Sequence, residues 1–241
     1  MTSENHPIHY IISPEIFSRF PEYVRGIVLA KTVSNYPSPK ELVNLLREAE
    51  AEVLSALNSQ DLTTVPQIAA WREAYRTLGI KPSEFRPSME AMIRRVLNGH
   101  ELPSINALVD IGNIVSLRHL LPVGGHAMDN LSADITLKAA SGREFFTAFG
   151  SDQIEHPEVG EFIFCEGDTV LTRRWTWRQS NHTLTTLDTK EIEFNVDALP
   201  PVSAADTENA CREIVELVRK FCGGDTSIHL LSRHRPRVRV R

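Results

Sequence analysis

The chain has 241 residues and a mass of 27.1 kDa, with 41% hydrophobic and 24% charged residues. A chain of this length buries about 70% of its unfolded surface on folding. Its composition excludes disordered, collagen-like, coiled-coil and disulfide-scaffold proteins. The formal net charge is -5. This charge excludes a wholly basic nucleic-acid-binding surface, so any contact with a polyanion must be local.

The sequence shows no targeting, membrane-spanning or metal-binding pattern. The first nine residues lack a basic segment followed by an apolar one, and no apolar run approaches the roughly 20 residues of a membrane span. Cys165, Cys211 and Cys222 form no Cys-x-x-Cys pair and have no histidines at ligand spacing beside them. We therefore expect a non-exported, cytoplasmic protein with reduced cysteines, no metal and no cofactor.

The first half of the chain predicts two strands followed by helices. Residues 8–12 and 24–33 are rich in β-branched side chains, as is typical of strands. Ser38, Pro39 and Glu41 then predict a helix start with a Ser-x-x-Glu capping box. Apolar residues continue from there at helical spacing to about residue 57. Further helical patterns cover 66–79, 89–99 and 104–120.

The second half of the chain changes to the short period of strands. The predicted strands are 135–138, 144–149, 161–165, 169–177, 182–186 and 191–196, separated by glycines and polar residues. An apolar stripe predicts a last helix over 206–221, with Gly223 as its C-terminal cap. No repeat or long linker divides the chain, so the pattern favours one α+β domain.

Standard enzyme motifs give no support for several chemistries. The chain has no Gly-x-Gly-x-x-Gly after a strand, no phosphate-binding P-loop, no His-Glu-x-x-His, no Gly-x-Ser-x-Gly and no EF-hand loop. Four local features remain as candidates for function.

The first feature is the helical pattern that begins near residue 104. Asn106, Asp110 and Asn113 recur at spacings of four and three, so they would share one helix face opposite an apolar face. Two interpretations stay open. The side chains either cap or cross-link nearby backbone, or they form the polar wall of a small-molecule pocket.

The second feature is the segment that contains Gly124, Gly125 and His126. Paired glycines let a backbone approach a ligand and offer unhindered N–H donors, while the histidine could orient a water molecule or donate to a carbonyl. The alternative is a simple turn between the preceding helix and the first strand of the sheet.

The third and fourth features are rich in arginine. In a strand over 173–179, arginines would stand beside two tryptophans, as in sites that bind phosphates and stack bases. The alternative is a pair of core tryptophans with the guanidinium groups paired to carboxylates. Five of the last nine residues, 233–241, are arginines, which could follow a phosphate backbone, form a charged edge strand or fray as a chain end.

These residues together carry a resemblance to a known family. The run 89–150, with Ile93, Arg94 and Arg95, then LPSINALVDIGNIVSL and then 122–129, resembles the B3/B4 domain, the tRNA-editing module of the bacterial phenylalanyl-tRNA synthetase β subunit. The chain is more similar to stand-alone B3/B4-domain proteins, in which an Arg-Arg-Trp-x-Trp-Arg-Gln segment, here 173–179, replaces a glycine-rich segment. The similarity covers about residues 65–222.

The resemblance implies a site in this chain. Asp110 and Asn113 match the family's Val-Asp-x-x-Asn run, and Arg94 or Arg95 falls near its pocket arginine. Residues 126–129 echo the family's His-Ala-Phe-Asp, but two extra residues separate them from the preceding proline.

Without that insertion, Gly124 takes the place of the family's histidine. The family's pocket glutamate aligns with Asn195, and Glu193 stands two residues earlier on the same strand face.

The resemblance implies an α+β fold with a three-layer, β-rich B3/B4-type core flanked by N-terminal helices and a C-terminal helix. We divide the chain into N-terminal strand and helix elements (1–64), the B3/B4-type domain (65–224) and a basic tail (225–241), which form a single structural unit. The expected catalytic residues are His126, Asp110 and Asn113. The expected substrate-binding residues are Arg94, Arg95, Asn106, Gly124, Gly125, Arg173, Arg174, Trp175, Arg178, Glu193 and Asn195.

The implied function is hydrolysis of a mischarged aminoacyl-tRNA in trans, by water attack on the ester. The chain lacks a class II synthetase core, so it would not aminoacylate tRNA by itself. The expected partner is tRNA, aminoacyl-tRNA or a small amino-acid-like ligand, with no membrane partner and the oligomeric state left open. Two alternatives remain: a non-catalytic module that binds RNA or a small metabolite, and a small-molecule enzyme on the same fold.

Overall fold

The structure is a computed structural model that describes residues 7–58 and 61–241. The expectation about the start of the chain therefore lies largely outside the described residues. The helices are α1 (Pro14–Arg19), α2 (Lys40–Leu57), the short η1 (Leu62–Thr64), α3 (Pro66–Thr77), α4 (Ser88–Leu97), α5 (Ala107–His119) and α6 (Ala204–Phe221). Within this part of the chain, no helix is both long and apolar enough to cross a membrane.

The strands form two main sheets and one small hairpin. They are β1 (His9–Ile12), β2 (Val24–Lys31), β3 (Val123–Ala127), β4 (Ile135–Ala139), β5 (Phe146–Thr147), β6 (Ile154–Glu155), β7 (Phe162–Glu166), β8 (Thr169–Arg173), β9 (Arg178–Gln179), β10 (Glu191–Ala198), β11 (Asp225–Leu231) and β12 (Arg237–Arg239). The six-stranded sheet has the order β12-β1-β4-β7-β8-β9, and the four-stranded sheet has the order β11-β2-β10-β3.

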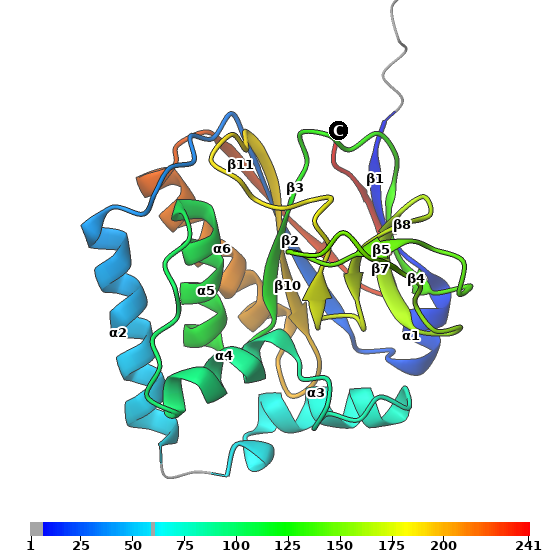
Figure 1. The fold of residues 1–241 in the computed structure, drawn as a ribbon, viewed down its shortest axis with the longest axis horizontal. Helices are drawn as coiled ribbons and strands as arrows, with labels where there is room; N and C mark the ends of the chain where they lie inside the picture. The colour runs from blue at the N-terminus through cyan, green and yellow to red at the C-terminus, as the bar shows by residue number, and fades with distance from the viewer. Residues whose placement is uncertain (1–6, 59–60) are drawn as a thin grey trace, which may run out of the picture.

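The two sheets and a helix pair make the three layers that the resemblance implies. Figure 1 shows α5 and α6 on one face of the four-stranded sheet and the six-stranded sheet on its other side, with α2 outside the helix pair. The close packing of α6 depends on Gly26 of β2, because a Cβ there would overlap the Sγ of Cys211. The fold is therefore α+β, as expected.

Strand β10 presents a different chemistry to each of its neighbouring layers. Ile192, Phe194 and Val196 are buried on the face toward the helices. Glu193, Asn195 and Asp197 alternate with them and point between the two sheets, where all three are also buried. A row of polar side chains inside a sandwich is costly unless each is paired, so this face points to a functional role.

Several of the expected elements differ from the structure, and the strand expected over 144–149 is reduced to Phe146–Thr147. Helix α2 begins at Lys40 without a side-chain cap, because the Ser38 hydroxyl donates instead to Asp110 Oδ2 at 2.6 Å. Residues 182–186 are not a strand but an irregular loop, although their polar and β-branched alternation resembles one. Gly124 and Gly125, for which we considered a turn, lie within β3.

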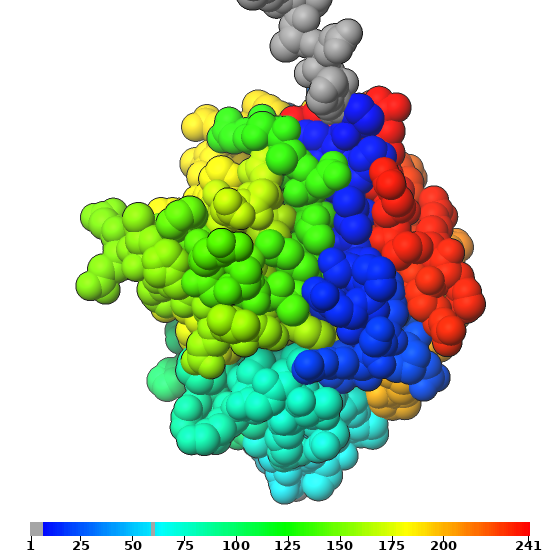
Figure 2. Space-filling view, turned by 90° about the vertical axis from the view of Figure 1, so that its right-hand side faces the viewer, coloured from blue at the N-terminus to red at the C-terminus, as the bar shows by residue number. Residues whose placement is uncertain are grey.

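The expected basic tail is also part of the fold. Residues 225–231 form the edge strand β11, and Arg237–Arg239 pair antiparallel with β1. Figure 2 shows the C-terminal segment (red) lying along the N-terminal strand (blue). Val238 and Val240 are buried, so the arginines that alternate with them face solvent. The valines anchor the segment and prevent it from fraying.

Candidate functional site

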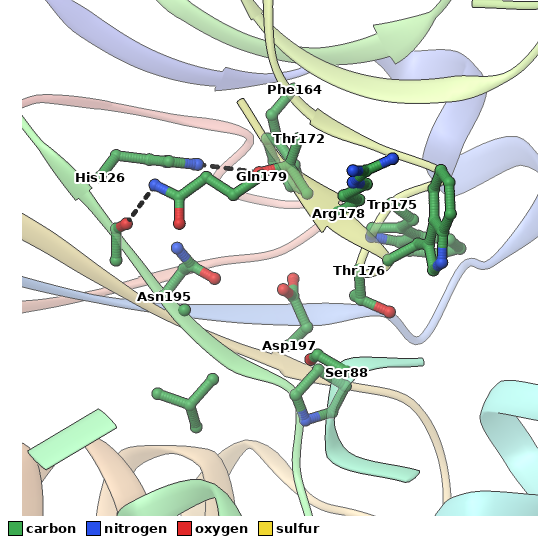
Figure 3. Close-up of a pocket in the computed structure, with 15 residues that line it drawn as sticks. Ser88, His126, Phe164, Thr172, Trp175, Thr176, Arg178, Gln179, Asn195 and Asp197 are labelled. Atoms are coloured by element: carbon green, nitrogen blue, oxygen red, sulfur yellow. Dashed lines mark hydrogen bonds between the residues drawn. The ribbon is translucent and has the colours of Figure 1, made fainter. Parts of the chain in front are cut away.

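Two cavities lie on opposite faces of β3. The polar cavity, of about 210 Å³, opens between the two sheets and is lined by Ser88, Pro122, Val123, Gly124, Gly125, His126, Phe164, Thr172, Trp175, Thr176, Trp177, Arg178, Gln179, Asn195 and Asp197 (Figure 3). The apolar cavity, of about 390 Å³, lies between α5, β3 and the 184–186 loop. Its lining residues are Ile105, Leu108, Val109, Gly112, Asn113, Val123, Gly124, Gly125, Phe149, Gln179, Leu184, Thr185, Thr186, Ile192 and Phe194.

The two glycines of β3 form the wall between the cavities. A Cβ on Gly124 would lie 3.0 Å from the Asn195 Oδ1 in the polar cavity, and a Cβ on Gly125 would lie 2.9 Å from the Ile192 Cδ1 in the apolar cavity. Alternation along the strand thus lets Asn195 pack closely against Gly124 on one side and Ile192 against Gly125 on the other. Because β3 is an edge strand, a ligand at this wall can reach both cavities.

His126 lies at the wall of the polar cavity and is 2% exposed. Its Nε2 lies 3.0 Å from the Thr172 Oγ1, and its Nδ1 lies 3.3 Å from the Glu193 Oε2. Figure 3 shows the imidazole directed across the cavity toward Thr172. His126 and Glu193 are cross-strand partners on β3 and β10, and Gly124 and Asn195 are the next partners on the same face.

This register places two pairs of residues side by side on the cavity wall. Gly124 and Asn195 stand where the family resemblance places a histidine and a glutamate. The chain carries His126 and Glu193 as the neighbouring pair of the same ladder, two residues along each strand. His126 and Glu193 thus form a histidine and glutamate pair one step of the strand pleat away from Gly124 and Asn195.

A buried charged cluster lies beneath the cavity. Arg25 Nη1 lies 2.6 Å from Asp197 Oδ1, and its Nη2 lies 3.7 Å from Glu193 Oε1. Arg25 also donates to the Tyr10 hydroxyl, and the Tyr23 hydroxyl donates to Asp197. Desolvation raises the pKa of Asp197 above its ordinary value, against the opposing effects of Arg25 and Tyr23.

Burial alone would lower the pKa of Arg25. The surrounding carboxylates and hydroxyls outweigh this effect and raise the pKa well above its ordinary value, so the guanidinium stays charged. Desolvation raises the pKa of Tyr10 and Tyr23 well above 10, which keeps both hydroxyls protonated and neutral. The cluster therefore provides a fixed charge arrangement behind His126.

Gln179 joins the edges of the two sheets. Its Nε2 donates to the Gly125 and Thr183 carbonyls, each at 2.9 Å. The Ala127 N–H, which also points away from β10, donates to Thr183 at 3.1 Å. Because N–H groups alternate in direction along a strand, the Gly125 N–H points to the same outer side. The outer edge of β3 and the Gln179 amide thus offer N–H donors at the junction of the two cavities.

The arginine–tryptophan segment forms a hairpin turn where we expected a continuous strand. Strand β8 ends at Arg173, and residues 174–177 turn back into β9. Arg174 and Trp175 both have left-handed backbones, with φ of 46° and 64°. Two such residues in succession match the twist of a tight hairpin, at a steric cost for side chains that have a Cβ.

Trp175 is 1% exposed and anchors this turn from inside. Its ring packs against Phe20, Tyr23 and Trp71, with centroids 4.9–5.0 Å apart. Trp175 is therefore a core residue, as in the alternative interpretation of this segment, whereas Trp177 is half-buried. The turn itself lies at the mouth of the polar cavity, since Thr176, Trp177 and Arg178 line it.

Two of the three expected phosphate-binding arginines are committed elsewhere. Arg173 makes two hydrogen bonds to Glu161, at 2.7 and 2.9 Å, and one to Glu155. The Arg174 guanidinium stacks 3.7 Å from the Phe85 ring centroid, and both arginines are buried. Arg178 alone of the three is exposed, and it lines the polar cavity.

The expected arginines of α4 lie away from both cavities. Arg94 Nε donates to Glu90 at 2.8 Å, and Arg95 Nε donates to the Glu101 carbonyl at 2.9 Å. Neither residue lines the polar or the apolar cavity. In this conformation they stabilise the ends of α4 and contact no ligand position in either cavity.

The three polar residues near the start of α5 do not share one face. Asn106 is the N-cap, accepting from the Val109 N–H and donating to the Thr185 carbonyl, each at 3.0 Å. Asp110 is fully buried and lines neither cavity. Its carboxylate accepts from Ser38, Ser104 and the Ile105 N–H. Asn113 alone lines a cavity, the apolar one.

Sequence reasoning missed several residues of the polar cavity, among them Thr172, Gln179 and Asp197. Thr172 carried no signal, because a single threonine in a strand is ordinary. Gln179 stood in a segment that we singled out for its arginines and tryptophans. Asp197 had a usable signal: it continues the alternation of Glu193 and Asn195 along β10. The described residues include no group of three or more histidine, cysteine, aspartate or glutamate side chains that could hold a metal ion.

Comparison with known proteins gives one family match and a similar solved structure. The family model for the B3/4 domain matches residues 70–223, and a search of curated proteins finds no match. A similar solved structure is an N-terminal fragment of the phenylalanyl-tRNA synthetase β subunit from Pyrococcus horikoshii, with 12% identity and a TM-score of 0.45. The alignment covers 89% of this chain and 49% of that one, so this chain spans about half of the fragment. The match over most of its length shows that this chain belongs to the B3/4 domain family.

Proposed function

We propose that this B3/4-domain protein hydrolyses the ester that joins an amino acid to the 3′ end of a tRNA, acting in trans. The observation that carries the proposal is the position of His126, between the Glu193 carboxylate and the Thr172 hydroxyl at the wall of the polar cavity. A buried imidazole whose Nδ1 faces a carboxylate keeps its Nε2 free to accept a proton.

The two cavities suit the two parts of an aminoacyl ester. Gly124, Gly125 and Gln179 line both, so a ligand at this wall can place its ester in the polar cavity and its side chain in the apolar one. Asn113, at the apolar cavity, would contact the amino-acid part. Asn195, at the polar cavity, would hydrogen-bond to the ester.

The RNA would leave the polar cavity past Arg178. This guanidinium is exposed and lies over the Trp177 ring, at 5.8 Å from its centroid. A cation beside an aromatic ring offers a phosphate contact and a surface on which a base can stack. Arg173 and Arg174 would support this rim through their contacts with Glu161 and Phe85.

Deacylation of a panel of aminoacyl-tRNAs tests the proposal. We expect the protein to accelerate release of at least one amino acid, and His126→Asn to slow that release by about 100-fold or more, as loss of a general base does. Arg178→Ala should weaken binding of uncharged tRNA while leaving the rate at saturation nearly unchanged. His100→Asn, which changes an exposed histidine outside the cavities, is the matched control.

The same experiment separates the alternatives. Binding of tRNA without release of any amino acid would contradict hydrolysis and support a non-catalytic module. Neither binding nor release across the panel would overturn the RNA assignment and leave a small-molecule enzyme on this fold.

A further inference from the structure

We propose that Thr172, His126 and Glu193 form a catalytic constellation in which the Thr172 hydroxyl, in place of a water molecule, attacks the carbonyl of an acyl ester. This inference rests on the proposed function and specifies its chemistry. It assigns Thr172 as the nucleophile, His126 as the general base and Glu193 as a positioning residue.

The distances meet the requirements of an activated nucleophile. Thr172 Oγ1 lies 3.0 Å from His126 Nε2, and the opposite ring nitrogen lies 3.3 Å from Glu193 Oε2. A hydroxyl, an imidazole and a carboxylate in this order define the triad arrangement, which is recognised by geometry and not by chain order. Neither the His126 Nδ1 nor the second oxygen of Glu193 makes a hydrogen bond among the described residues, so Glu193 acts on the imidazole as a neighbouring charge at 3.3 Å.

Three strands hold the constellation rigidly. His126 lies on β3, Glu193 on β10 and Thr172 on β8, so the contact between histidine and hydroxyl spans the space between the two sheets. The Glu193 side chain is fully buried and that of His126 is 3% exposed, whereas Thr172 is half-buried and lines the cavity. The base is thus shielded from bulk water while the hydroxyl stays open to a ligand.

The Glu193 carboxylate beside His126 is only loosely paired with the buried Arg25. Arg25 makes its close contact with Asp197, at 2.6 Å, and only a longer one with Glu193, at 3.7 Å. Two carboxylates therefore face one guanidinium. An imidazolium that forms on His126 would be stabilised by Glu193 in a region of low dielectric, where such an interaction is stronger than in water.

At Gly124 and Gly125 the wall of the polar cavity is formed by backbone. Gly124 and Gly125 present no side chain to either cavity, and the Gly125 N–H points to the outer side of β3. This N–H is a suitable donor to the oxygen that gains charge in the transition state.

The reaction balances without a cofactor. The Thr172 oxygen bonds to the carbonyl carbon while its proton moves to His126 Nε2. The bond between that carbon and the leaving oxygen then breaks, and His126 returns the proton to the leaving oxygen, which leaves an acyl-threonine ester. Water attacks this ester with His126 again taking a proton, and the bond to Thr172 breaks as its oxygen is reprotonated.

Rapid-quench experiments with p-nitrophenyl acetate and with an N-protected alanine p-nitrophenyl ester test the inference. We expect a burst of about one p-nitrophenolate per protein molecule. After acid quench, mass spectrometry should find one added acyl group on the peptide that contains Thr172. Thr172→Val should abolish the burst and slow turnover by about 100-fold or more, while Thr172→Ser should retain both.

Thr169→Val is the control, because Thr169 is a half-buried threonine of the same strand outside both cavities. Circular dichroism confirms that each variant folds. The same variants are assayed with aminoacyl-tRNA. Ester or tRNA hydrolysis that His126→Asn slows but Thr172→Val leaves unchanged would overturn the nucleophile and leave the proposed function in place. Absence of hydrolysis with every ester and every aminoacyl-tRNA would overturn both.

Discussion

At the scale of single residues, the register of β3 and β10 determines which polar side chains meet. The sequence identified His126 and Glu193 as candidates, but not their contact, because pairing of two distant strands depends on the whole fold. It also named Arg173, whose charge suggested phosphate binding. Whether a guanidinium faces solvent or a carboxylate such as Glu161 depends on tertiary packing, which local spacing does not show.

Asp110 provides a first prediction at this scale. Its carboxylate accepts from the Ser38 and Ser104 hydroxyls, at 2.6 and 2.5 Å, and from one backbone N–H. Asp110→Asn replaces an acceptor by a donor that faces other donors. We expect the free energy of unfolding to fall by about 2–3 kcal/mol, measured by urea denaturation.

The turnover of the folded Asp110→Asn variant should stay within a few-fold of the parent, because Asp110 lines neither cavity. Ser38→Ala, which removes one donor, should cost about 1 kcal/mol. A loss of turnover by about 100-fold with unchanged stability would show instead that Asp110 takes part in the chemistry, as the resemblance implied.

At the scale of elements, helices with clear periodicity were predictable and turns without glycine were not. The patterns near 66–79 and 89–99 match α3 and α4 to within two residues at each end. The turn at 174–177 was missed because its left-handed residues are arginine and tryptophan, which give no turn signal. Burial of Trp175 stabilises a backbone that local preference disfavours.

Tyr75 of α3 holds this turn, which gives a second prediction. Its hydroxyl donates to the Arg174 carbonyl at 2.7 Å and lies 2.9 Å from the Thr176 Oγ1. Tyr75→Phe should lower the free energy of unfolding by about 1–2 kcal/mol and increase hydrogen exchange at the Trp175 amide. Tyr36→Phe, whose hydroxyl bonds to the Phe221 carbonyl, is a distant control and should leave that amide unchanged.

The loop after β4 provides a third prediction, on pH. Burial alone would raise the pKa of Glu144, but hydrogen bonds from Lys138 and from the backbone at Ser141 outweigh it and lower the pKa to about 2. The group thus contributes stability that is fully present above its unfolded value of 4.5 and is lost as the pH falls from there toward 2.

Measuring the stability of Glu144→Gln and of the parent protein at decreasing pH checks the direction of this pH dependence. The variant should be less stable than the parent at pH 7, and the difference should shrink as the pH falls below 4.5. Glu84→Gln, which breaks an exposed pair with Lys81, should show almost no such dependence. A difference that grows at low pH would contradict the assignment.

At the scale of the whole molecule, the α+β class and its layers followed from the sequence, but the role of the last residues did not. An alternation of arginine with valine fits an edge strand and a frayed end equally well. Such a segment forms an edge strand only where a neighbouring strand is free to pair with it, and β1 is that strand here. In the described part of the chain, Arg233, Arg235, Arg237 and Arg239 form no salt bridge, so this edge is locally cationic on an acidic protein.

This cationic edge carries the last prediction, which concerns tRNA. Strands β12 and β9 are opposite edges of one six-stranded sheet, so the arginine edge and Arg178 on β9, at the mouth of the polar cavity, lie about 24 Å apart at the ordinary spacing of strands. A ligand that occupies the cavity reaches this edge only if it is a macromolecule. We expect the exposed arginines to contact tRNA phosphates, with each contact contributing about -0.9 to the slope of log affinity against log salt for duplex RNA.

Replacing Arg237 and Arg239 by serine should therefore weaken tRNA binding and reduce the magnitude of that slope by up to about 2 in a filter-binding salt titration. Hydrolysis of the small p-nitrophenyl esters should not change, because those esters are too short to reach the edge. A double variant with Arg143→Ser and Arg212→Ser removes the same charge from exposed positions elsewhere. If this control reduces the slope equally, net charge governs binding; if neither variant changes it, the RNA follows another surface.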